Sequence, residues 1–132
     1  MERQTYTTNT VFENRIGYSR ALRVGPHAYV AGTLGMGLDG GPAEGGAYGQ
    51  SVAALERIRG ALEEVGASLS DVVRTRMFVV DILDHQEDVG RAHAEYFADV
   101  RPVSSMIGIS GLAAPGYVVE WEIDAIVPPT PG

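Results

Sequence analysis

Residues 118–127, VVEWEIDAIV, alternate apolar and acidic side chains along the stretch. Successive side chains of a β-strand point to opposite faces, so this spacing predicts a strand with one apolar and one acidic face. The apolar face carries Val119, Trp121, Ile123, Ala125 and Val127, and the acidic face carries Glu120, Glu122 and Asp124. The apolar face belongs in a core. The acidic face either meets water, as in a half-solvated strand, or lines a site.

Two other stretches have the apolar spacing of helices. In residues 48–66 the stripe is Val52, Leu55, Ile58, Leu62 and Val65, and in residues 84–102 it is Val89, Ala92, Tyr96, Phe97 and Val100. Gly66 is placed to end the first helix. Asp84 and Glu87 form a cap-like pair that predicts the start of the second helix, and Pro102 lies beyond its end.

The remaining patterned segments predict strands near residues 5–8 and at 19–24, 27–33, 72–80 and 104–110. The chain order is therefore strands, helix, strand, helix, strands. This order predicts an α+β fold in which two helices cover one face of a mixed β-sheet and make crossover connections between parallel strands. At 132 residues the chain is long enough for one domain, which we expect to span residues 1–132.

The stretch VVRTRMFVV, residues 72–80, is apolar on both faces of its predicted strand. Val73, Met77 and Val79 fall on one face, and Val72, Phe78 and Val80 fall on the other. Two helices cover one face of such a sheet, and a chain of this length has no further element to cover the second face. We therefore expect a closed homo-oligomer, with a small-molecule cleft at the subunit interface.

The composition excludes several classes of function. A formal charge of −7 and a pI near 4.8 oppose binding to nucleic acid. All ten basic residues are arginine, so Schiff-base chemistry on lysine is unavailable, and the absence of cysteine excludes disulfides and thiolate nucleophiles. The sequence has no bilayer-spanning run and no signal-peptide pattern, so we expect no membrane partner and a cytoplasmic location.

The remaining short motifs are weak. GMGLDG matches a dinucleotide-binding pattern at Gly35, Gly37 and Gly40, but further glycines and a proline follow instead of a helix, so a loop is expected. The histidines are His27, His85 and His93, and their spacing is not that of metal ligands, so we expect no metal site. Ser104, Ser105 and Ser110 lack the surroundings of a nucleophile elbow.

Four arginines lie on or beside the expected strands: Arg20, Arg23, Arg74 and Arg76. On a solvated strand they are ordinary surface charges, with their stems on apolar surface and their heads in water. If an oligomer buries the sheet face, they become partners for the three acids of residues 118–127, because a buried acid without a partner costs several kcal/mol.

Four segments resemble those of a known family. IGYSRALRVGPHAYVAGT resembles an I-G-x-Y segment leading to a strand that ends in S-G, and LSDVVRTRMFVVDILD resembles D-V-V-K-T-x-V-F-V-x-D. RPVSSMIGISGL and VVEWEIDAIV resemble P-A-R-S-C-V-x-V-x-x-L and V-E-I-E-A-I-A. These segments are those of the Rid group, also called YjgF or UK114, and they occur in the same order over nearly the whole chain.

The resemblance implies a homotrimer of chorismate-mutase-like α+β subunits with a cleft between each pair of neighbouring chains. Active members of the group hydrolyse 2-imino or 2-enamino acids to 2-oxo acids and ammonia without a metal or organic cofactor. In them an arginine holds the substrate carboxylate, and a strand glutamate helps to place or activate the attacking water. The partners implied are therefore a small-molecule ligand and further copies of this chain.

Carried over by position, the glutamate of the group falls on Glu120, its tyrosine on Tyr18 and its strand-ending glycine on Gly32. Three positions depart from the pattern, because the arginine falls on Ser104, the cysteine on Met106 and the serine before the glycine on Ala31. Losing a bidentate clamp is expected to cost a hundredfold or more in binding, on the scale of about 1.5–3 kcal/mol for each charged hydrogen bond. The candidates to replace it are Arg20, Arg76 and Arg101, in that order.

Three functions remain open. The first is cofactor-free hydrolytic deamination of an imine, enamine or related carbonyl derivative at an intersubunit cleft, with Glu120 as acid and base. The second is a ligand-binding or regulatory protein that keeps the cleft without the chemistry. The third, ribonuclease or translation inhibitor, is a label attached to some relatives, and the acidic charge makes it the weakest.

Overall fold

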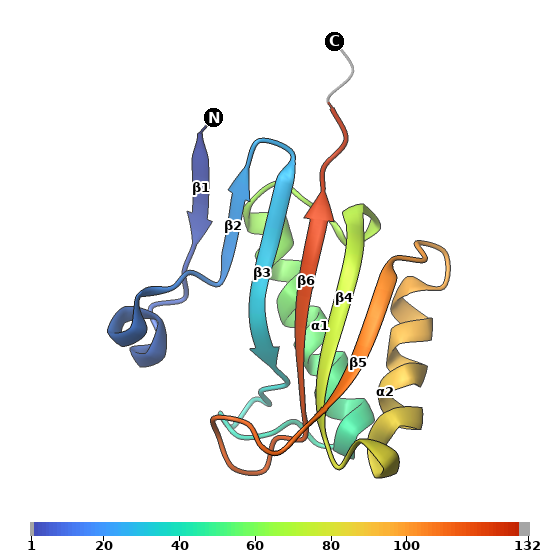
Figure 1. Cartoon of the computed structure of the whole chain (residues 1–132). Helices are drawn as coiled ribbons and strands as arrows, with labels where there is room; N and C mark the ends of the chain where they lie inside the picture. The colour runs from blue at the N-terminus through green and yellow to red at the C-terminus, as the bar shows by residue number, and fades with distance from the viewer. Residues whose placement is uncertain (1, 130–132) are drawn as a thin grey trace.

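The computed structural model describes residues 2–129, which form a six-stranded mixed sheet with two helices (Figure 1). The strands are β1 (Arg3–Tyr6), β2 (Ala21–Val24), β3 (His27–Leu34), β4 (Val72–Val80), β5 (Val103–Ile109) and β6 (Val119–Ile126), and the helices are α1 (Gly46–Glu64) and α2 (Ile82–Phe97). The strand order is β1-β2-β3-β6-β4-β5. Only the pair β4–β5 among these is parallel.

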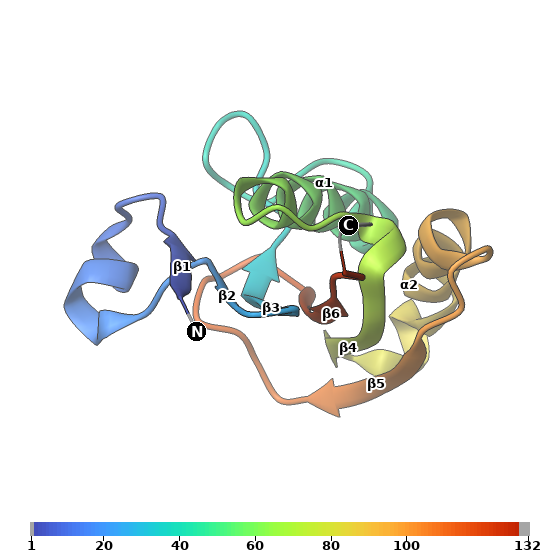
Figure 2. The ribbon, with the colours of Figure 1, turned by 90° about the horizontal axis from the view of Figure 1, so that it is seen from above.

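Both helices lie on one face of the sheet, as the sequence predicts (Figure 2). Each belongs to a crossover connection. β4 and β5 pair in parallel around α2, and β3 and β4 run parallel to each other because both pair antiparallel with β6. The α+β prediction with two helices on one sheet face is confirmed, and β6 occupies the centre, where one face packs and the other stays free.

The predicted stripes form the core beneath the helices. Trp121, Ile123 and Val119 of β6 are fully buried, together with Leu55, Ile58 and Leu62 of α1 and Val89 and Phe97 of α2. The Trp121 indole donates a hydrogen bond from Nε1 to the buried hydroxyl of Ser51 on α1, at 3.1 Å. This bond satisfies the indole N–H inside the core and fixes α1 against β6.

Gly66 ends the first helix as predicted, with φ of +78° and the Ala67 N–H bonded to the Leu62 carbonyl at 2.8 Å. The predicted start of the second helix is wrong. α2 begins at Ile82, two residues before the expected cap at Asp84, and its N-cap is Asp81 in the left-handed region with φ of 51°. A left-handed aspartate directly after a strand has no periodic signature, so the pattern around Asp84 misplaced the boundary.

The predicted faces of β4 are wrong at its first two residues. Val72 is buried beneath the helices and Val73 is 41% exposed, the reverse of the expected arrangement. The pairing with β6 shifts register between Val72 and Arg74, and an irregularity of this kind inserts one extra residue and moves the side chains before it to the other face. From Thr75 onward the alternation is regular.

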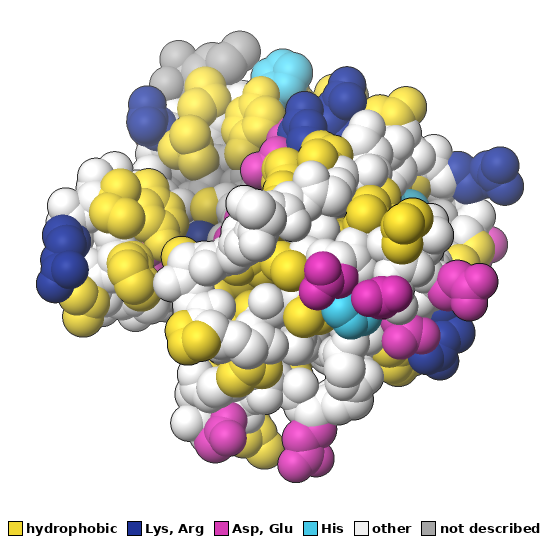
Figure 3. Space-filling model, turned by 60° about the horizontal axis from the view of Figure 1, so that its bottom comes forward, with side chains coloured by type: hydrophobic (Ala, Val, Ile, Leu, Met, Phe, Trp, Pro, Cys, Tyr) yellow, Lys and Arg dark blue, Asp and Glu magenta, His cyan; other side chains and the backbone are white. Residues whose placement is uncertain are grey.

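Residues 35–45 form a loop, so the expectation for GMGLDG is confirmed. The sequence did not predict a short π-helical turn, which residues Glu13–Gly17 form. The segment that contains this turn projects beyond β1 (Figure 1), and the side chains of Val11, Phe12 and Ile16 are 66%, 53% and 68% exposed. Figure 3 shows hydrophobic side chains gathered on this projecting part of the surface. None of the helices within residues 2–129 combines the length and apolar character needed to cross a bilayer.

The open face of the sheet, opposite the helices, carries the acidic side of β6. The apolar side chains on this open face include Tyr29, which is 44% exposed, and Ile107, which is 38% exposed. No described residue of this chain covers these side chains well, in agreement with the expectation that one chain leaves this face uncovered.

Candidate functional site

Glu120 lies on the open face in a row of apolar neighbours. In register it stands between Leu34 of β3 and Phe78 of β4, and Ile107 of β5 lies beside Phe78. Glu122 and Asp124 follow on the same face, as the alternation predicts, but beside arginines. The three acids therefore share a face and differ in surroundings.

Gly32 makes room for the Glu120 carboxyl group. A Cβ on Gly32 would lie 2.5 Å from Glu120 Oε1 and 2.7 Å from Cδ, closer than non-bonded atoms approach. The pairing of β3 with β6 shifts register between Val30 and Thr33, so Ala31 and Gly32 sit at this irregularity. The side chain of Glu120 consequently rests against the β3 backbone, where only glycine leaves space.

The Glu120 carboxyl group is half-buried, and burial raises its pKa above the ordinary value. Arg20 opposes this rise through its positive charge, and Glu122 adds to it. A raised pKa suits a group that must both accept and return a proton near neutral pH. The group therefore has the electrostatic properties of an acid–base catalyst.

Arg20 lies beside Gly32 and is only 8% exposed. Its Nη2 donates a hydrogen bond to the Gly32 carbonyl at 3.0 Å, and its guanidinium lies over the Tyr18 ring, 5.4 Å from the ring centroid. Its buried Nε has no hydrogen-bond partner among residues 2–129. The structure thus brings four predicted site residues together: Glu120, Gly32, Arg20 and Tyr18.

Glu13 holds the projecting turn that ends at Tyr18. Its Oε1 accepts a bond from the Thr8 N–H at 2.9 Å, and its Oε2 accepts bonds from the hydroxyls of Thr8 and Thr10 at 2.6 and 2.7 Å. Burial favours a raised Glu13 pKa, but these hydrogen bonds outweigh it and lower the pKa. The Tyr18 N–H bonds to the Glu13 carbonyl at 3.1 Å, so this anchored turn positions the tyrosine.

The other two candidate clamps are placed differently. Arg76 is already paired, with its Nη1 lying 3.1 Å from Glu122 Oε1 and 3.5 Å from Asp124 Oδ2. Arg101 is exposed in the turn before β5, with φ of 56°. Of the three arginines, Arg20 is the one whose charge acts on Glu120.

Ser104 and Met106 lie on the helix-covered face, opposite Glu120. They pair in register with Thr75 and Met77, whose side chains are buried beneath the helices. The Thr75 hydroxyl donates to Ser104 Oγ at 2.8 Å and also bonds His93 Nε2 at 2.8 Å. Within one chain, these two positions do not meet Glu120. Ala31 contributes its backbone, because its N–H bonds to the Arg20 carbonyl at 3.0 Å.

The histidines lie apart. His85 Nδ1 bonds to the Val80 carbonyl at 2.9 Å, and His93 stacks on Trp121 with ring centroids 5.8 Å apart. Burial lowers the His93 pKa. Among residues 2–129, no group of three or more histidine, aspartate or glutamate side chains is arranged to hold a metal ion.

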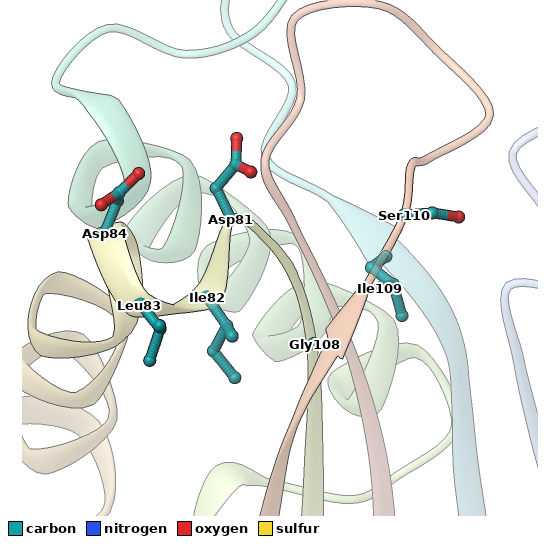
Figure 4. Close-up of a pocket in the computed structure, with 7 residues that line it drawn as sticks. All are labelled: Asp81, Ile82, Leu83, Asp84, Gly108, Ile109 and Ser110. Carbon is teal, nitrogen blue, oxygen red and sulfur yellow. The ribbon is translucent and has the colours of Figure 1, made fainter.

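A cavity of about 540 Å³ lies between the start of α2 and the end of β5, lined by Asp81, Ile82, Leu83, Asp84, Gly108, Ile109 and Ser110. Figure 4 shows the two aspartates pointing upward, the side chains of Ile82 and Leu83 pointing downward, and Ser110 pointing away to the right. Because these polar groups diverge, the cavity does not have the converging arrangement of a catalytic site.

Sequence reasoning missed Glu13 and Arg57. Arg57 lies on α1 beside the predicted apolar stripe, and its Nη1 donates to the Leu34 carbonyl at 2.7 Å. The signal that was available is the spacing of Arg57, Gly60 and Ala61, which share one side of the helix and include two residues too small to fill the space beside it. For Glu13, no periodic pattern marks the turn.

Comparisons with known proteins agree with this fold. A family model described as "Endoribonuclease L-PSP" matches residues 8–127. A crystal structure from Mycobacterium tuberculosis, described as a member of the YjgF/YER057c/UK114 family, is 45% identical, covers 96% of this chain and 100% of its own, and has a TM-score of 0.86.

Two sequence relatives are similar to most of the chain. An uncharacterized protein of Streptomyces coelicolor is 34% identical over 117 residues, which cover 86% of this chain and 84% of the relative. A protein of Dermatophagoides farinae named 2-iminobutanoate/2-iminopropanoate deaminase is 28% identical over 111 residues, which cover 83% of this chain and 84% of the relative.

Proposed function

Because the chain belongs to the Endoribonuclease L-PSP family, which is the YjgF or Rid family, we propose that it hydrolyses a small imine, enamine or related carbonyl derivative. The observation that carries this proposal is the Glu120 carboxyl group, half-buried against Gly32 and beside Arg20. The name of the Dermatophagoides farinae relative, an imino-acid deaminase, supports the same reaction class.

In the proposed reaction Glu120 moves protons between water and the substrate nitrogen. It takes a proton from water as the water oxygen bonds to the imine carbon, and it delivers that proton to nitrogen. It then takes the proton of the new hydroxyl group and returns it to nitrogen as the carbon–nitrogen bond breaks. The products are a carbonyl compound and ammonia, so Glu120 ends in its starting state.

Arg20 is the proposed anchor for a substrate carboxylate. Its charge acts on Glu120, and the one hydrogen bond of its side chain goes to a neutral backbone carbonyl. No carboxylate among residues 2–129 lies within ion-pair distance of its guanidinium. Tyr18 lies under its guanidinium and would hold the arginine in place. A guanidinium can bind a carboxylate through two parallel hydrogen bonds.

We also propose that the working assembly is a homotrimer with its open sheet faces turned inward. The exposed Tyr29 and Ile107 and the half-buried Phe78 give that face apolar surface that one chain leaves uncovered. Sedimentation at micromolar concentration is expected to give the mass of a trimer. A stable monomer would remove the intersubunit cleft and leave Glu120 half-buried on an uncovered sheet face.

The function is tested with imino acids generated in situ and a readout of ammonia release. Glu120→Gln keeps the shape of the side chain and loses proton exchange, so we expect the rate to fall by about a hundredfold or more. Glu122→Gln is the matched control on the same strand and face, and its rate should remain near that of the wild type. Equal rates for Glu120→Gln and the wild type would give the acid a structural role.

The anchor is tested by comparing Arg20→Gln with Arg76→Gln. Loss of a charged contact to the substrate should raise KM by about tenfold to a hundredfold in Arg20→Gln. Arg76 is paired with acids, so its variant should show little change. A neutral imine that lacks a carboxylate should be insensitive to both changes. The reverse ranking of the two variants would assign the anchor to Arg76.

Ser104 favours a second candidate function, ligand binding without chemistry. It occupies the clamp position of the Rid pattern and is bonded to Thr75, on the sheet face opposite Glu120. In this alternative a 2-oxo acid binds to the wild type and to Glu120→Gln with similar affinity, and neither protein accelerates ammonia release. Calorimetric titration with 2-oxobutanoate beside the rate assay separates the two functions.

A further inference from the structure

A second cavity, of about 240 Å³, lies on the helix side of the sheet at the edge formed by β1–β3. It is lined by Tyr6, Thr8, Arg20, Val30, Thr33, Arg57, Gly60, Ala61 and Glu64. Figure 2 shows α1 running across this part of the sheet, with β1 and the projecting turn beyond its edge. The lining residues of α1 are Arg57, Gly60, Ala61 and Glu64, which follow one side of the helix.

Two arginines line this cavity without an acidic partner. Arg20 is 8% exposed and bonds the Gly32 carbonyl, and half-buried Arg57 bonds the Leu34 carbonyl. Neither forms an ion pair within residues 2–129, whereas four other arginines do. The buried Nε of Arg20 also has no partner among those residues. Two cations withdrawn from water and facing one cavity require a counter-charge.

The nearby acids do not supply that counter-charge directly. Glu13 acts on both arginines through its charge, but its two oxygens accept bonds from Thr8 and Thr10. Glu64 lies exposed at the cavity lining. Burial lowers the Arg57 pKa, and the positive charge of Arg20 lowers it further. These two acids disfavour a ligand that carries several negative charges.

We propose that this cavity binds a small monoanionic carboxylate, held between Arg20 and Arg57, with a short apolar tail against Val30 and Ala61. Two planar guanidinium groups match the geometry of a carboxylate. The volume admits a few carbon atoms beyond the carboxylate, and the buried Val30 and Ala61 provide apolar wall. The lining residues on β3 and α1 lie on the helix side of the sheet, whereas Glu120 lies on the open face. The two sites share Arg20, so a carboxylate in the cavity competes with the proposed substrate carboxylate for that guanidinium.

Arg20 connects this cavity to the proposed catalytic acid. It lines the cavity and, at the same time, lowers the Glu120 pKa against the effect of burial. A carboxylate bound between the arginines would neutralise part of that charge.

The test is calorimetric titration of the full chain with sodium butyrate at constant ionic strength, with sodium phosphate as the second probe. Saturable binding of one butyrate per chain is expected, with weaker binding of phosphate. Arg57→Gln should weaken butyrate binding by about tenfold to a hundredfold. Arg59→Gln is the matched control: it removes the same charge from the same helix, and Arg59 is exposed and paired with Glu56.

A second variant guards against a folding defect in Arg57→Gln. Gly60→Leu keeps both arginines and fills the cavity, because a Cβ at Gly60 meets no atom within 4 Å and leucine suits a helix better than glycine. It should also abolish butyrate binding. Glu120→Gln should retain it, so a failed deaminase proposal leaves this one standing. Equal butyrate binding by Arg57→Gln and Arg59→Gln, or no saturable binding by the wild type, would overturn the proposal.

Discussion

The two faces of β6 have opposite relations to the rest of the chain. On the helix-covered face, Val119, Trp121 and Ile123 are fully buried. On the open face, Glu120 and Glu122 alternate with them and remain half-buried, one beside apolar side chains and one beside Arg76. One strand thus carries both the core and the candidate chemistry, separated by the thickness of a backbone.

The difference shows that this fold places a half-buried carboxyl group on the open face of the sheet and not in the core. The helix-covered face uses apolar contact and satisfied hydrogen bonds, as in the Trp121–Ser51 pair. The open face holds a carboxyl group whose pKa is raised by burial, which lowers the stability of the folded chain when the group ionises. Groups that cost stability are expected to be retained for function.

The largest effect is expected from Trp121→Ala, which removes the largest fully buried side chain. It should lower the free energy of unfolding by about 3–5 kcal/mol. Glu122→Ala, the next residue on the opposite face, should lower it by about 1 kcal/mol or less. Urea unfolding of both variants measures the contrast. Similar losses would show that the open face is packed as tightly as the core.

A smaller effect is expected from Gly32→Ala. Its new Cβ would overlap Glu120 Oε1, so the carboxyl group must leave its place or the strands must separate. The overlapping atoms are the end of a flexible side chain that can turn away, so the expected loss of stability is about 1 kcal/mol, the low end of the usual cost of overpacking. Any Glu120-dependent activity should be lost. Gly90→Ala on α2 is the control, since its Cβ meets no atom within 4 Å, and it should stabilise the chain slightly. A Gly32→Ala protein with wild-type stability and activity would contradict the close approach.

The sequence was sufficient to predict β6, the two helices and the buried stripes, because period and burial agree in those segments. It failed where one residue decides the geometry. The register shifts before Arg74 and around Gly32, and the left-handed Asp81 before α2, depend on tertiary packing and leave no periodic trace.

For the candidate site, the family resemblance predicted Glu120, Gly32 and Tyr18, and the structure places these residues near Arg20. The lack of an acidic partner for Arg20 and Arg57 among residues 2–129 could not be predicted, since it depends on which acids are paired or hydrogen-bonded elsewhere.

The third prediction concerns pH. A carboxyl group with a raised pKa in the folded state binds its proton more tightly there than in the unfolded chain. Its stabilising contribution is full below the ordinary pKa and is lost as the pH rises through the raised pKa. Glu120→Gln does not titrate at this position. Its stability relative to the wild type should therefore increase from pH 4 to pH 8, measured by thermal unfolding in matched buffers. A difference that does not change with pH would remove the inferred burial effect.

The smallest effect is expected at the ion pairs of the open face. Arg76 contacts both Glu122 and Asp124, with side chains about one-third exposed, so Arg76→Gln should cost at most about 1 kcal/mol. Most of that cost should disappear in 1 M salt, because the Debye length falls to about 3 Å. Arg59→Gln breaks a more exposed pair with Glu56 and should cost less at both salt concentrations. The comparison sharpens the division within the open face, because the paired arginine there contributes weakly to stability while Glu120, beside apolar neighbours, is expected to determine activity. If Arg76→Gln instead unfolded the chain or dissociated its oligomer, the pair would lie in a buried interface, and the acids of β6 would be equal in their surroundings.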